Sequence, residues 1–197
     1  MPLLSTIVEQ INSVLVAPKF TEEHFHGSRF NGIAIPYTKL LKDRQVTAPA
    51  VRKKGTKDLE AVGYDDRYPM TIYHKLIGNT YSVQEVDNYG NDYSMIKQVT
   101  QMQMIVWANY SRVGFLTEHE LEATISGALF GELDLKPFID IFIAPTTTNF
   151  DKSGLFSQEY KGVENLLSNE HLYFGINYTI ESYFDKSCFS LCDCTTV

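Results

Sequence analysis

The chain has 197 residues, of which 44% are hydrophobic and 21% are charged, and its formal net charge is −7. This composition suits one domain with its own core and excludes wholesale disorder. The acidic balance argues against a general nucleic-acid-binding protein, which needs cations to neutralise phosphates. We therefore expect a single domain over residues 1–197, and no stretch has the length of a membrane span.

The first predicted element is a helix, because apolar residues from Leu3 to Leu15 recur every three or four positions and line one face. Pro18 ends it, since proline disfavours the helical conformation at the residue before it. Further on, Ile33–Pro36 predicts a short edge strand. Residues 42–63 carry few regular signals and predict a long exposed loop or arm.

Strand patterns begin at Met70. Two β-rich runs around Gly78–Asn79 predict a hairpin, because glycine supplies the positive φ of a primed turn. A second turn is expected over Asp87–Asp92. The run Thr100–Tyr110 predicts the longest strand, and its second face becomes apolar at Ile105–Trp107, as for a central strand covered by a helix.

Thr117 and Glu120 form a capping box that starts a second helix, and Gly131 is expected to stop it after Phe130. Phe138–Ile143 predicts a buried strand, and a long polar loop separates it from a last strand at Leu172–Ile180. This order of elements predicts an α+β fold. We expect a mainly antiparallel sheet with the N-terminal helix and the second helix packed on one face, and long loop insertions.

No motif in the sequence dictates a chemistry, so we predict no catalytic, cofactor-binding or metal-binding residue and no enzymatic activity. A rival interpretation is a metal-dependent hydrolase or another small enzyme that uses His24, His26, Asp65 and His74, although their spacing matches no known metal site. The cysteines lie in a terminal segment, residues 185–197, and form no disulfide framework; they are Cys188, Cys192 and Cys194. With no signal-peptide pattern at the N-terminus, they indicate synthesis in a reducing compartment.

Two features predict contacts with other proteins. One is a basic strip from Lys42 to Lys57 with a local charge of +6 − 1 = +5, which leaves −12 for the rest of the chain. This strip suits either docking onto an acidic neighbour or a solvated loop. The other is a set of aromatic residues in expected loops, which either anchor an interface or pack on their own domain. The candidate partner-binding residues are Arg52, Lys53, Lys54, Lys57, Tyr64, Tyr68, Phe150, Phe156 and Tyr160.

The element order resembles that of the tail-terminator and tail-completion proteins of tailed bacteriophages, including related neck ring proteins. The resemblance runs from the Leu3–Leu15 helix through the Thr100–Tyr110 strand and the capped helix to the Leu172–Ile180 strand. It implies a structural virion protein, made in the host cytoplasm, that forms a homo-oligomeric and commonly sixfold ring at the head–tail junction. Its partners would be neighbouring neck, portal or tail-tube proteins, with DNA only as passing cargo and no membrane. A cellular adaptor domain is a further alternative.

Overall fold

The computed structural model describes residues 2–16, 25–41, 44–53, 56–62, 67–88, 91–114, 117–132, 142–149 and 171–185. The elements in chain order are α1 (Pro2–Val16), β1 (Arg29–Leu41), β2 (Arg44–Arg52), β3 (Leu59–Ala61), β4 (Met70–Asn88), β5 (Asn91–Asn109), α3 (Tyr110–Val113), α4 (Glu118–Glu132), β6 (Phe142–Asn149) and β7 (His171–Asp185). No helix in these ranges is long and apolar enough to span a membrane.

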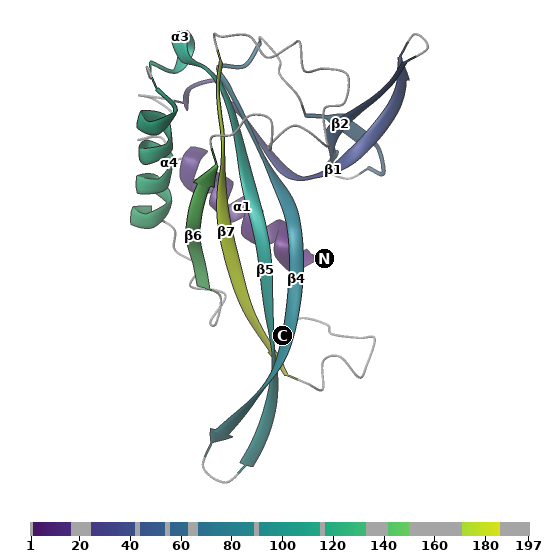
Figure 1. The fold of residues 1–197 in the computed structure, drawn as a ribbon, viewed down its shortest axis with the longest axis vertical. Helices are drawn as coiled ribbons and strands as arrows, with labels where there is room; N and C mark the ends of the chain where they lie inside the picture. Colours follow the sequence, from purple (N-terminus) through teal and green to yellow (C-terminus); the bar gives the residue numbers. More distant parts are fainter. Residues whose placement is uncertain are drawn as a thin grey trace.

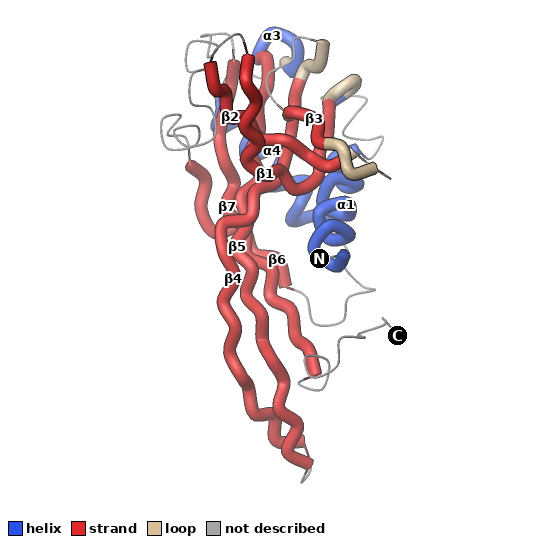
Figure 2. Tube along the Cα trace, turned by 90° about the vertical axis from the view of Figure 1, so that its right-hand side faces the viewer, coloured by secondary structure: helices blue, strands red, loops and turns tan. Residues whose placement is uncertain are grey.

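The strands form one sheet in the order β3-β2-β1-β4-β5-β7-β6. Among the described strands only β1 and β4 pair in parallel, and the other neighbours are antiparallel. Helices α1 and α4 lie on the same side of this sheet, and the lower ends of β4, β5 and β7 extend beyond them (Figures 1 and 2). The predicted α+β class, with a mainly antiparallel sheet and both helices on one face, is confirmed.

The larger core lies between the two helices and the sheet. Helix α1 contributes the stripe that its periodicity predicts, with Ile7, Ile11 and Leu15 fully buried. Alternate residues of β5 and β7, such as Met104 and Phe174, face this stripe. The alternation expected for β7 is confirmed on the helix side, because its apolar residues from Leu172 to Ile180 are buried there.

A second, smaller core lies on the opposite face of the sheet. Ile105 and Trp107 of β5 are buried there beside Tyr73 and Tyr173. We expected a helix to cover this face, which was wrong. The covering residues include Val51 of β2 and Val62 after β3, so strands that curl over the sheet bury this face.

Of the two alternatives expected for residues 42–63, a loop or an arm, the loop was wrong, because this segment contains β2 and β3. Strand β1 pairs with β4 from Arg29 to Ala34, then leaves it and pairs with β2 from Ile35 to Leu41. We call Ile35–Leu41 together with β2 and β3 the arm; it stands out beside the main sheet (Figure 1). The short edge strand expected around Pro36 is therefore the middle of a long strand. Pro36 pairs with Pro49 of β2. Since β1 has already left β4 at this point, it is an edge strand here, where proline is tolerated.

The expected hairpin at Gly78–Asn79 is absent, because β4 runs without interruption from Met70 to Asn88. Gly78 instead follows a register shift, at which Ile77 is the extra residue between two paired positions. Such a bulge satisfies the backbone without a turn, and glycine is common at bulges. The turn expected over Asp87–Asp92 is confirmed, since Asn88 pairs with Asn91 across the strand ends.

Helix α4 begins with the predicted capping box. The Thr117 amide donates to the Glu120 carboxylate at 3.2 Å, and the Glu120 amide donates to the Thr117 hydroxyl at 3.2 Å. Gly131 does not stop the helix, which continues to Glu132.

The strand expected at Phe138–Ile143 overlaps β6, which spans Phe142–Asn149 and therefore does not end at Pro145. Proline is tolerated there because β6 is the last strand of the sheet, and the register shifts beside it. Residues 138–141 and 150–169 of the expected strand and loop, like Pro18, lie outside the described residues.

Candidate functional site

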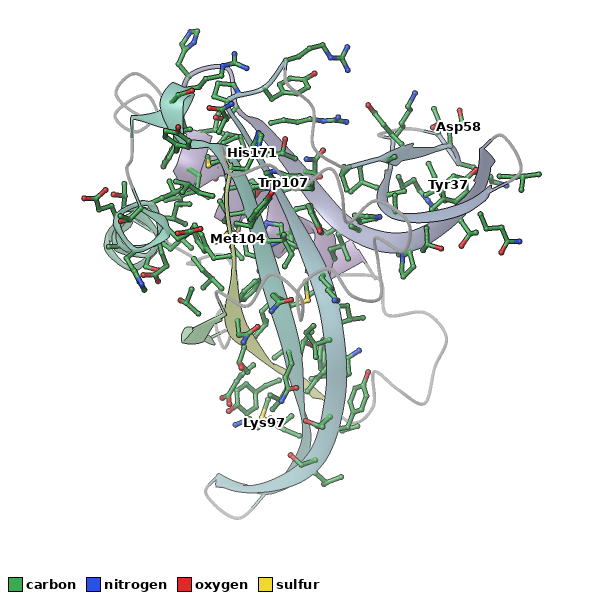
Figure 3. All side chains as sticks on the ribbon, turned by 45° about the horizontal axis from the view of Figure 1, so that its top comes forward. Tyr37, Asp58, Lys97, Met104, Trp107 and His171 are labelled. Carbon is green, nitrogen blue, oxygen red and sulfur yellow. The ribbon has the colours of Figure 1, made fainter. Side chains whose placement is uncertain are left out.

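The arm carries large apolar side chains in contact with water. Leu40 is 68% exposed, and Ile35 and Tyr37 are exposed as well. Figure 3 shows Tyr37 and Asp58 out on the arm, far from Trp107 in the body of the molecule. Surfaces of this kind are typical of regions that become buried on association.

Three of the predicted basic residues meet at one turn of the arm. Arg52, Lys53 and Lys57 are all exposed around the connection between β2 and β3. The turn is closed by two backbone hydrogen bonds, from the Lys53 amide to the Asp58 carbonyl at 2.9 Å and from the Thr56 amide to the Lys53 carbonyl at 3.2 Å. These three cations of the strip therefore lie at the turn between β2 and β3.

Of the predicted aromatic contacts, the structure places only Tyr68. Its ring is partly buried near two guanidinium groups, those of Arg29 at 5.6 Å and Arg67 at 5.8 Å. Arg29 also bonds Glu60 of β3 at 2.7 Å, so Tyr68 packs within its own chain at the base of the arm. The remaining predicted partner-binding residues lie outside the described residues: Lys54, Tyr64, Phe150, Phe156 and Tyr160.

A second exposed surface lies along β4, where the sequence predicted a turn. β1 accompanies β4 only as far as Lys75, and no other described strand pairs with the outer edge of β4 beyond that point. Three apolar side chains are exposed in this stretch, Ile77 at 51%, Tyr81 at 56% and Val83 at 60%. The sequence signal was present as β-rich residues on both sides of Gly78, but it was interpreted as two short strands.

Between the two surfaces lies a cleft of about 450 Å³. It forms where β1 turns away from β4, and its walls include Pro36 and Pro49 of the arm and Tyr73 and Leu76 of β4. The cleft therefore exposes two diverging strands beside apolar side chains.

His74, a residue of the rival metal-site interpretation, lies in the core between α1 and β7. Its Nε2 is 3.0 Å from Oδ1 of Asn12, and its Nδ1 is 2.8 Å from the Tyr178 hydroxyl. The Asn12 amide nitrogen donates to the Asn31 carbonyl at 2.9 Å, so the Asn12 oxygen faces the imidazole and accepts from Nε2–H. The Tyr178 hydroxyl therefore donates to Nδ1.

This network fixes one neutral tautomer of His74. Burial lowers the pKa of His74 to about 3, because a charged ring would lose its hydration. Both ring nitrogens are committed to structural hydrogen bonds, so His74 has no lone pair free for a metal. His26 is exposed, His24 and Asp65 lie outside the described residues, and no group of three or more possible ligands gathers among the described ones.

No family model matches this chain, and no curated protein matches it in sequence.

Proposed function

We propose that this protein is a non-enzymatic structural protein of a phage virion that forms a ring at the head–tail junction. Its role there would be that of a tail terminator, a tail-completion protein or another neck component. The proposal is supported by the order of elements along the chain, in which α1 precedes all the strands and α4 lies between β5 and β6. The partners of the ring are its own copies and the adjoining neck, portal or tail-tube proteins.

The observation that carries the proposal is the exposed apolar arm. A ring closes only when two different faces of one subunit meet, because each copy presents one face to each neighbour. The arm stands beside the main sheet and carries exposed Ile35, Tyr37 and Leu40 on one chain segment (Figure 1). Burial of such side chains against a neighbour would stabilise the ring through the hydrophobic effect.

The charge of the chain is consistent with DNA as passing cargo. The net charge is −7, and the basic residues Arg52, Lys53 and Lys57 are collected on one turn of the arm. A mostly acidic surface gives phosphates few cationic partners, so DNA can move past without being held.

The test is sedimentation velocity of the purified chain, with electron microscopy of the sedimenting species. We expect closed rings for the parent and a loss of at least about tenfold in association for Leu40→Asp, because the carboxylate would be buried against a neighbour. The matched control is Val16→Asp, which changes a valine that is 48% exposed at the end of α1. A parent that stays monomeric at every concentration, or an oligomer unaffected by Leu40→Asp, contradicts the proposal as stated.

A further inference from the structure

We propose that the outer edge of β4 from Ile77 onward binds the β6 edge of a second copy of this chain, so that the sheet continues from one subunit into the next. This inference rests on the proposed ring and names the strands that join its subunits.

The β4 edge has the properties of an unfilled pairing site. A strand edge presents a row of backbone N–H and C=O groups, which readily pair with a strand from another chain. Among the described strands only β1 approaches this edge, and its pairing with β4 ends at Ala34 and Lys75. Beyond Lys75, β4 continues to Asn88 and pairs with β5 on its other side.

The side chains beside this edge are apolar on one face of the sheet. Tyr81 pairs with Gln98 of β5. Alternate residues of a strand share a face, so Gln98 lies on the same face as Thr100, which pairs with Ile180 on the helix side of the sheet. Tyr81 and Val83 therefore also lie on the helix side. Both are more than half exposed. The opposite face of the same extension carries an ion pair, with Lys97 bonded to Glu181 at 2.8 Å (Lys97 is labelled in Figure 3). A partner strand would therefore bury apolar groups on one face without disturbing an ion pair.

The β6 edge is complementary in direction and length. β6 ends the strand order, and β7 is its only neighbour among the described strands. Three successive antiparallel pairings, β4 with β5, β5 with β7 and β7 with β6, make β6 antiparallel to β4. In a ring whose rotation axis runs along the strands, the strand directions are preserved from copy to copy. β6 of the next copy would then meet β4 as an antiparallel partner. β6 has eight residues and spans roughly 26 Å. The free part of β4 is long enough to pair with all of it.

Two different edges make this contact heterologous, which is the kind of contact that repeats around a ring. A twofold contact of β4 with its own symmetry mate would also be antiparallel, but it would end at a dimer. The two arrangements bring different residues together, so a cross-linking experiment distinguishes the ring contact from the dimer contact.

The first experiment compares Val83→Lys with the matched control Val16→Lys by sedimentation velocity. Both replace an exposed valine, at 60% and 48% exposure, and neither is in a core. We expect Val83→Lys to weaken association at least tenfold and Val16→Lys to leave it unchanged, with the circular dichroism spectrum of each variant like that of the parent. An oligomer that tolerates Val83→Lys overturns the β4 contact but leaves the ring in place. A monomeric parent overturns both.

The second experiment cross-links the two edges in a chain whose three cysteines, Cys188, Cys192 and Cys194, are replaced by serine. Protein with Ile77→Cys is mixed, in separate reactions, with proteins that each carry one cysteine at a different position of β6, and each mixture is treated with a short bismaleimide. We expect cross-linked dimers in at least one mixture and none in any of the proteins alone. Dimers from Ile77→Cys alone would show a β4–β4 contact and overturn the proposal, as would oligomeric mixtures without a cross-link at any position of β6.

Discussion

Mild acid should destabilise this protein before most of its carboxylates are protonated, because His74 must stay neutral in the folded state. Its pKa is about 3 when buried, whereas an unfolded histidine takes up a proton near pH 6.5. Below pH 6.5 the unfolded chain therefore binds the extra proton, and the stability that is complete above this pH declines toward pH 3. Each pH unit well inside this window is worth about 1.4 kcal/mol, so lowering the pH from 7.5 to 5.0 should cost about 2 kcal/mol.

The measurement is denaturant unfolding at several pH values between 7.5 and 5.0, followed by far-ultraviolet circular dichroism. His74→Gln is the comparison variant, since its amide can donate to Asn12 but cannot titrate. We expect this variant to be less stable at pH 7.5 and to lose about 2 kcal/mol less than the parent on acidification.

Two results would refute this reasoning. A parent whose free energy of unfolding is constant from pH 7.5 to 5.0 would mean that His74 is protonated equally easily in both states. Identical pH profiles for the parent and His74→Gln would assign any acid sensitivity to other groups. Either result would contradict the lowered pKa of His74 in the folded state.

Three further predictions test the local structure and the arm. Thr117→Ala should lower the free energy of unfolding by about 1 kcal/mol, because the Glu120 amide loses its cap, and an unchanged melting curve would contradict that cap. Gly127→Ala should stabilise α4 by up to about 1 kcal/mol, since nothing lies within 4 Å of the added carbon. Gly114→Ala should instead destabilise the protein, because Gly114 has φ +76°. Thermal melts in which Gly114→Ala is the more stable of the two variants would contradict both expectations. Replacing Arg52, Lys53 and Lys57 of the basic turn with glutamate should leave thermal unfolding nearly unchanged but weaken ring formation, as measured by sedimentation. If the parent binds DNA in a salt-sensitive manner and this variant does not, the turn is a nucleic-acid contact instead.

The sequence by itself determined the elements whose causes are local. The capping box at Thr117 requires only residues three apart, and the apolar stripe of α1 repeats with the period of a helix. The alternation in β7 follows from the pleat of a single strand, so its helix-facing residues were predicted correctly. The order of these elements along the chain then predicted the α+β class and the packing of both helices on one face of the sheet.

Only the tertiary structure decided the features that depend on partners distant in sequence. Gly78 lies in a bulge and not in a turn because β5 continues to pair with β4 beyond it. The second face of β5 is covered by the arm, whose strands show no clear alternation and are held by pairing with β1. His74 was a possible metal ligand in the sequence, but Asn12 and Tyr178, which lie 62 and 104 residues away, make it a buried structural residue. Such contacts have no local periodicity, because the whole chain must fold before the partners meet.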